Sequence, residues 1–206
     1  MNVFLVVLLI AVPACGLALT YRRAGGPVGR TFARTPRTTV AEATPGVARL
    51  SGRAVAVDAV PVSEASGRSY VAREPAIVPS CDGPDGTHRF EQAVDFLLDD
   101  GSGIALVKGA GGRVSVDRDF EAPVTTLDEV PWVDELLRSD GYHNGSPATC
   151  RIRLSEGVIR DGSTAAVVGR VEASDDAARA LGAAVVVRGT ASTPVMIRAE
   201  REPAAS

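Results

Sequence analysis

Aromatic residues are scarce in this 206-residue chain and make up only 4% of it. Proteins that bind single-stranded nucleic acids stack bases on exposed aromatic rings and carry basic surfaces along the phosphate backbone. This chain has few rings and a formal net charge of −3. Its composition therefore disfavours nucleic acid as a partner.

Cysteine is also scarce, with three residues in the whole chain. Three cysteines exclude a disulfide-rich scaffold. Cys15 falls within an apolar leader, which leaves Cys81 and Cys150 as one possible pair. Disulfides persist in oxidising compartments, so whether these two cysteines pair depends on the side of the membrane that the domain occupies.

Metal and cofactor motifs are not evident. Cys81, His88, His143 and Cys150 show a mirrored spacing, Cys-x6-His and His-x6-Cys. Zinc ligands usually stand two to four residues apart, so we interpret this spacing as coincidence and expect no metal and no cofactor.

Catalytic motifs are not evident either. Glu91, Asp95, Asp99 and Asp100 could act as paired carboxylates or as a cation site, but a hairpin needs turn formers and a polar face in any case. The Ser-Gly pairs of the chain lack the G-x-S-x-G frame of a nucleophile elbow. We therefore expect no catalytic centre and do not interpret the chain as an enzyme.

A membrane anchor is the clearest positive signal. Val3 to Leu19 carries no charge over 17 residues, just long enough for a transmembrane helix. Val12 to Cys15 has the outline of a lipobox, but Pro13 and the uncharged start argue against a lipoprotein, and the same start argues against a cleaved secretory signal. We expect residues 1–20 to be an uncleaved anchor that contacts the lipid bilayer through residues 3–19.

Arginines follow this anchor and none precedes it. The positive-inside rule then predicts a single-pass protein whose soluble domain lies on the cytoplasmic side. The segment 21–45 is rich in Thr, Pro, Arg and Gly, so we expect a flexible linker whose arginines fix topology or meet anionic headgroups. The arginines in question are Arg22, Arg23, Arg30, Arg34 and Arg37.

We expect residues 46–199 to form one β domain and residues 200–206 to be a disordered tail. The central stretch, Phe90 to Val116, contains two apolar runs joined at Asp99 to Gly103, which predicts a hairpin. Seven or eight short strands without a βαβ rhythm predict an all-β fold with one inserted helix, a small OB-like Greek-key barrel.

The inserted helix is expected within Thr126 to Arg138. Starting it at Asp128 leaves Pro131 in the first turn, where a missing N–H costs little. A helix inserted between the strands of a small barrel is expected to plug one end of it. A shorter helix, capped by the Ser174-Asp175-Asp176 segment and ended by Gly182, competes with a plain loop.

Five arginines are candidate binding residues. If the strands at 149–159 and 164–171 pair, three of them share one solvent face that can bind an anion or a partner, and two more can add to it. The plainer interpretation is a solvated face whose arginines pair with nearby acids. The five are Arg151, Arg153 and Arg170, then Arg68 and Arg73.

Four segments, taken in order, resemble the GIDE/BAM domain family, the β domain of mitochondrial MAPL/MULAN-type E3 ubiquitin ligases and of prokaryotic relatives. Ser66 to Glu74 is similar to its SG-x-x-[CY]-V strand, Phe96 to Gly103 to its F-x-L-x-D-x-[ST]-G hairpin, Glu156 to Gly169 to its E-x-x-[IL]-x-x-G…V-x-G strand pair, and Pro194 to Ile197 to its closing strand.

The resemblance implies a membrane-linked β domain and does not extend to ligase activity. A RING needs about eight Cys and His zinc ligands in short paired spacings, and this chain has three cysteines and two histidines. We therefore expect a membrane-anchored binding module with an unidentified protein partner. The alternative is an OB-type module that binds nucleic acid or oligosaccharide.

Overall fold

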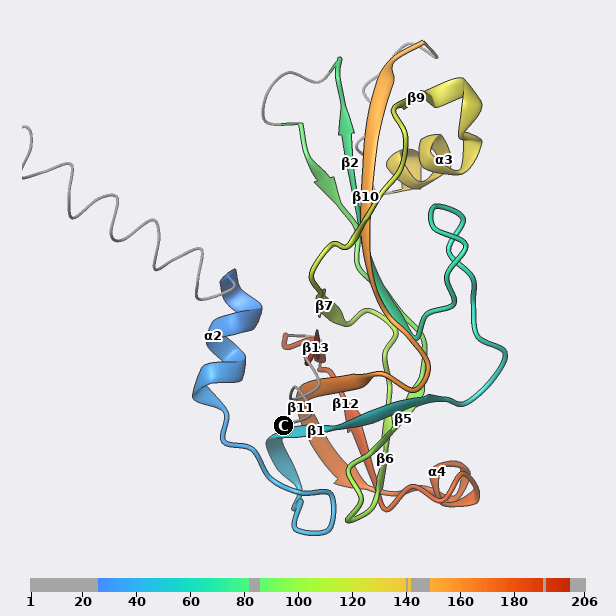
Figure 1. Cartoon of the computed structure of the whole chain (residues 1–206). Coiled ribbons are helices and arrows are strands. Elements are labelled where there is room, and N and C mark those ends of the chain that lie inside the picture. The colour runs from blue at the N-terminus through green and yellow to red at the C-terminus, as the bar shows by residue number, and fades with distance from the viewer. Residues whose placement is uncertain (1–25, 82–85, 140, 142–148, 191, 201–206) are drawn as a thin grey trace, which may run out of the picture.

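The computed structural model describes residues 26–81, 86–139, 141, 149–190 and 192–200 (Figure 1). The expected anchor at 1–20 lies outside these ranges, as does most of the expected tail. Among the helices of the described ranges, none is long and apolar enough to cross a membrane. Glu200, assigned to the tail, is instead held in place by an ion pair with Arg49 at 2.8 Å.

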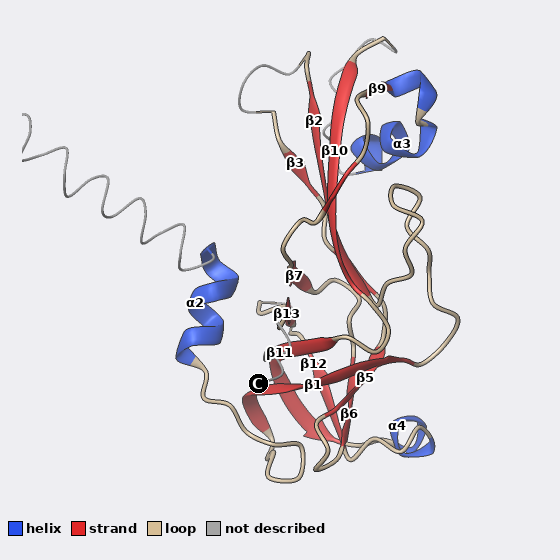
Figure 2. Cartoon of the chain, viewed as in Figure 1, coloured by secondary structure: helices blue, strands red, loops and turns tan. Residues whose placement is uncertain are grey.

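A closed barrel of five strands forms the lower part of the molecule (Figure 2). Each strand pairs with the next, and β1 returns to pair with β11, so the ring has no open edge. Only β6 and β12 run parallel within this ring. The strands in ring order are β1 (Gly46–Ala56), β5 (Phe96–Asp99), β6 (Ile104–Val107), β12 (Val185–Arg188) and β11 (Thr164–Ala173).

The interior of the barrel is filled by aliphatic side chains and one ring. Leu50, Phe96, Leu98 and Val167 are fully buried there. The predicted hairpin is the β5–β6 pair, in which Phe96 faces Val107. Strands β13 (Met196–Ala199) and β7 (Arg113–Ser115) extend the sheet beyond β11. The prediction of an all-β barrel is confirmed.

A second sheet rises from the barrel, and we call it the arm. Its two long strands are β2 (Ala72–Pro79) and β10 (Arg151–Ile159), which pair antiparallel along their whole length. The chain enters the arm twice, once between β1 and β5 and once between β6 and β11. The short strands of the arm are β3 (His88–Arg89), β4 (Gln92–Ala93), β8 (Phe120–Glu121) and β9 (Thr125–Thr126).

A disulfide between Cys81 and Cys150 closes the arm. The β2–β10 register pairs Pro79 with Ile152, and two further residues along each strand bring the cysteines face to face. The sequence left open whether Cys81 and Cys150 form a disulfide, and this strand register brings them together.

The inserted helix packs on the arm and does not plug the barrel. A single 3-10 turn, η1 (Leu127–Glu129), precedes α3 (Pro131–Ser139), with the proline at the first helical position. Val133 and Leu137 of α3 pack with Ile152 and Leu154 of β10. The expectation of a plug was wrong because β10 carries a second apolar cluster well above the barrel, and the helix covers that cluster.

The expected linker is also corrected, because residues 26–45 fold onto the barrel. Helix α2 (Gly26–Arg34) buries Val28 and Phe32 against Ala166 and Val168 of β11. Further on, Val40 joins the barrel core. A few apolar residues spaced along a polar segment were enough to dock it.

Candidate binding site on the arm

A β-bulge opens the sheet between β10 and its outer neighbours. Ser155 pairs with Glu121 in β8, while Ile152 pairs with Thr125 in β9. Residues 122–124 therefore lie opposite only the two β10 residues between Ile152 and Ser155. Three residues opposite two define a β-bulge. Residue 123 is proline, which has no N–H to donate to the ladder. The chain bows away from β10 at this point.

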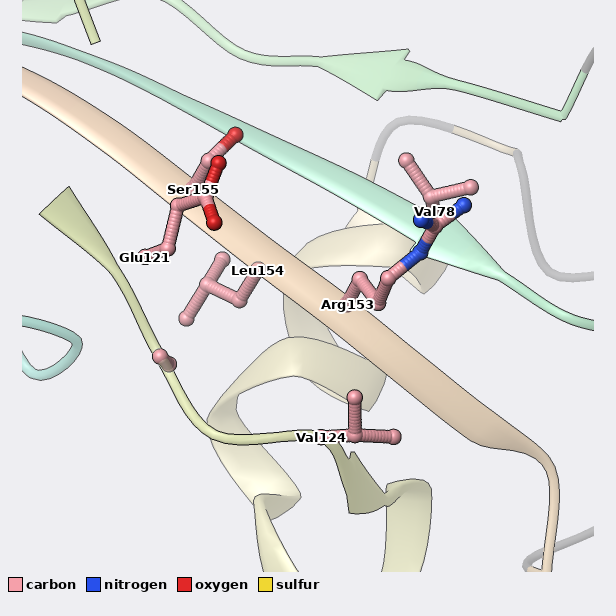
Figure 3. Close-up of a pocket in the computed structure, with 7 residues that line it drawn as sticks. Val78, Glu121, Val124, Arg153, Leu154 and Ser155 are labelled. Atoms are coloured by element: carbon pink, nitrogen blue, oxygen red, sulfur yellow. The ribbon is translucent and has the colours of Figure 1, made fainter. Parts of the chain in front are cut away.

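A groove of about 320 Å³ follows from the bulge (Figure 3). Its walls come from three strands or segments that are distant in sequence: Val78 of β2 opposite Arg153 of β10, and Glu121 and Val124 from the bowed chain. Val124 is 48% exposed, one of four large apolar residues exposed in the described chain. The groove therefore combines apolar walls with one positive and one negative side chain.

The positive charge of the groove is available for binding. Arg153 and its neighbour Arg151 alternate with the buried Ile152 and Leu154, so both arginines point to the solvent side of β10. Neither guanidinium has an ionic partner among the residues that the structure describes. The site can hold an apolar side chain next to an acidic group, because an unpaired guanidinium binds carboxylates by charge-assisted hydrogen bonds.

The five arginines predicted as one face do not come together. β10 pairs with β2, β8 and β9, whereas β11 pairs with β1, β12 and β13, so Arg170 lies on the barrel, far along the chain path from Arg151 and Arg153. Arg170 is within 3.7 Å of Glu172 across an exposed contact. The predicted arginine face required β10 and β11 to pair with each other, and they do not.

Arg68 is held at the base of the arm. Its Nη1 lies 2.8 Å from Asp119, its Nη2 donates to the Glu156 carbonyl at 3.4 Å, and its guanidinium lies 5.6 Å from the Phe120 ring centre. The positive charge of Arg68 is therefore paired within the chain. Arg68 connects the two insertions and does not belong to the groove.

Arg73 is buried and belongs to an internal network. Glu156 has no exposed surface, and its carboxylate accepts hydrogen bonds from Ser63 Oγ at 2.8 Å and Ser66 Oγ at 2.5 Å. Arg73 Nη1 lies 3.5 Å from this carboxylate and 2.9 Å from Glu64. A buried carboxylate held by two hydroxyls and a guanidinium is a structural arrangement.

The surroundings of Arg73 agree with this role. Its Nε donates to Gln92 at 2.6 Å, and the guanidinium stacks 4.7 Å from the centre of the Tyr70 ring. Burial raises the pKa of Tyr70 above its ordinary value, against the opposing effect of Arg73. Burial likewise acts to raise the pKa of Glu64, but its own backbone N–H and Arg73 bring the pKa below the ordinary value.

Cys81, His88, His143 and Cys150 were considered as metal ligands, but Cys81 and Cys150 form the disulfide with each other. His143 lies outside the described residues. Of the five predicted arginines, Arg153 lines the groove and Arg151 lies beside it on the solvent side of β10, while Val78, Glu121 and Val124 were missed. The only sequence signal for them was Pro123 inside an alternating segment, which is typical of an edge strand or a bulge.

Comparison of the chain with protein-family models, with curated proteins and with solved structures gives no match. The GIDE/BAM resemblance therefore stays a prediction that depends on the four motifs alone.

Proposed function

We propose that this chain is a membrane-anchored interaction module in which the barrel carries the arm and the groove at the Pro123 bulge binds a protein partner. The observation that carries the proposal is Arg153, which has no ionic partner among the described residues, beside the exposed Val124 in a groove of about 320 Å³. Arginine is enriched at protein interfaces and at their hot spots, and the buried core of an interface is more apolar than the surrounding surface.

The arm is built to hold this groove in one shape. On the inner side of β10, α3 packs on Ile152 and Leu154, and beyond the strand ends Cys81 and Cys150 tie the two insertions together. A groove that is held in place loses less conformational freedom on binding, which favours affinity.

An OB-type nucleic-acid or oligosaccharide binder is the alternative, and the barrel itself argues against it. An OB-type barrel binds ligands on the face of its second and third strands, which correspond here to β5 and β6. Helix α4 (Asp176–Ala180) covers that face, because Ala178 packs with Leu106 and Val186. The face that this alternative needs is occupied.

Membership of the GIDE/BAM family is part of the proposal. Its four motifs fall on defined elements of this chain: the entry to β2, the β5–β6 hairpin, the β10–β11 connection and β13. We propose no catalytic centre. Glu156, the most buried carboxylate of the motifs, already accepts hydrogen bonds from Ser63 and Ser66.

The groove is tested with a photo-crosslinking residue at position 124 in the full chain, expressed in its native membrane. We expect a discrete adduct that is lost when Arg151→Glu and Arg153→Glu are combined. The matched control is the pair Arg34→Glu and Arg37→Glu, which makes the same change in charge at the end of α2 and three residues beyond it. A crosslinker at Leu181, which is exposed at the end of α4 on the barrel, should give no such adduct. Identical patterns at positions 124 and 181 would refute the proposal.

The side of the membrane is a second part of the proposal. The arginines after residue 19 predict the cytoplasmic side, but the disulfide needs an oxidising compartment. We propose that the domain faces the oxidising side. In a Cys15→Ser background, a membrane-impermeant maleimide should label intact cells only after an impermeant reductant. Free thiols that appear on lysis without any reductant would place the domain in the cytoplasm.

A further inference from the structure

We propose that the flank of the barrel carrying α2 is a membrane-contact surface that binds anionic lipid headgroups. The inference rests on the proposed membrane anchor. It assigns a ligand class to a part of the chain that is distant from the groove, and three observations carry it.

The first observation is the short path between the anchor and the folded domain. Only residues 20–25 separate Leu19 from the first residue of α2, so Gly26 lies within about 25 Å of the end of the anchor even if the chain is fully extended. Because Phe32 is 1% exposed and packs on the barrel, α2 is part of the domain (Figure 1). The flank that carries α2 is therefore held close to the bilayer.

The second observation is the charge of this flank. Val28 and Phe32 lie on the buried side of α2, and Arg34 is exposed. Arg37 is also exposed, and its backbone pairs with that of Arg49 in β1. Within the ranges that the structure covers, Arg34 and Arg37 have no acidic partner. Arginines near an anionic membrane surface are attracted to it.

The third observation is an apolar opening beside these charges. Val47 is 68% exposed, more than any other large apolar residue of the described chain. It lines a cavity of about 250 Å³ with Val168, Met196 and Thr31 of α2, and Thr31 lies three residues before Arg34 on the same helix. An exposed apolar residue next to arginines is the combination that surfaces use at the headgroup boundary of a bilayer.

The test uses the full chain in lipid nanodiscs, with Val47→Trp as a fluorescent probe in a Trp132→Phe background. Discs contain phosphatidylcholine alone or an equal mixture with phosphatidylglycerol, each with lipids brominated near the headgroup. We expect the fluorescence of the residue-47 probe to be quenched several-fold more in the anionic discs. The same probe at Val62, 57% exposed at the base of the arm, should remain unquenched.

Charge reversal then isolates the arginines. Arg34→Glu with Arg37→Glu should reduce quenching to the level of neutral discs, whereas Arg151→Glu with Arg153→Glu should leave it unchanged. Equal quenching in neutral and anionic discs, or none in either, overturns the inference. A chain that does not enter the discs at all overturns the anchor and this inference together, so the two failures are distinguishable.

Discussion

The guanidinium carbon of Arg198 lies 4.5 Å from the centre of the Phe32 ring, which joins the end of the described chain to its beginning. Arg49 approaches the same ring at 5.7 Å, and Glu200 bonds to both arginines. Cation–π contacts of this kind contribute more when they are shielded from water, as Phe32 is. This cluster holds α2 on the barrel.

Phe32→Ala is expected to release α2. Removing a buried phenylalanine costs about 3–5 kcal/mol through lost contacts and the cavity left behind. Hydrogen exchange in residues 26–34 should accelerate strongly, while exchange in the barrel strands changes little. Arg34→Ala, on the exposed side of the same helix, serves as the control. Unchanged exchange in Phe32→Ala would show that α2 docks by other contacts.

Arg73→Met is expected to destabilise the fold by about 3–5 kcal/mol, because it leaves the buried Glu156 carboxylate without its cation. Combining it with Glu156→Gln should recover part of this loss, since the uncompensated charge is then gone. Denaturant unfolding of the two variants measures the difference. If Arg73→Met keeps full stability and instead loses the position-124 adduct, Arg73 belongs to the binding site after all.

Asp100 is expected to make part of the stability dependent on pH. Burial acts to raise its pKa, but hydrogen bonds from Ser102, Gly103 and the Val40 N–H (2.7 Å) bring the pKa below its ordinary value. A carboxyl whose pKa is lower in the folded state stabilises the fold above its unfolded pKa of about 3.9. This contribution is lost as the pH falls through the folded pKa.

Asp100→Asn should therefore reduce the free energy of unfolding by about 1–3 kcal/mol at pH 7, and the difference from the parent should shrink below about pH 4. Unfolding curves between pH 3 and pH 7 measure it. Asp58→Asn, at an exposed position, is the control. A difference that stays constant down to pH 3 would contradict the role of the ionised carboxylate.

Reduction of the disulfide is expected to lower the free energy of unfolding by about 2–5 kcal/mol, since the bond closes a long loop. The double variant Cys81→Ser and Cys150→Ser should show the same loss and no further response to reductant. Unfolding midpoints with and without reductant provide the measurement. A parent protein that is insensitive to reductant would mean that the bond does not form.

The barrel was predictable because its signals are local. Apolar alternation and a glycine-containing turn, with Gly101 at φ 80°, define the β5–β6 hairpin without reference to the rest of the chain. The short helix α4 was predictable for the same reason, because Asp175 caps it by accepting the Ala178 N–H at 2.8 Å and Gly182 follows it at φ 79°.

The binding site was only half predictable. Alternation along β10 correctly placed Arg151 and Arg153 on its solvent side, but it carries no information on which strand lies beside them. The groove depends on Val78 and on the chain around Pro123, which the β2–β10 and β8–β10 registers bring together.

The sequence by itself therefore determined the apolar leader, the all-β character, the main hairpin and the alternation of each strand, since these depend on neighbours within a few residues. Only the tertiary structure decided that two insertions form an arm, that Cys81 meets Cys150, and that Arg73 is buried while Arg153 is exposed at the groove. Strand pairing joins residues far apart in the chain, and the same alternating pattern satisfies many partners. The choice among partners is made by packing, which no single segment specifies.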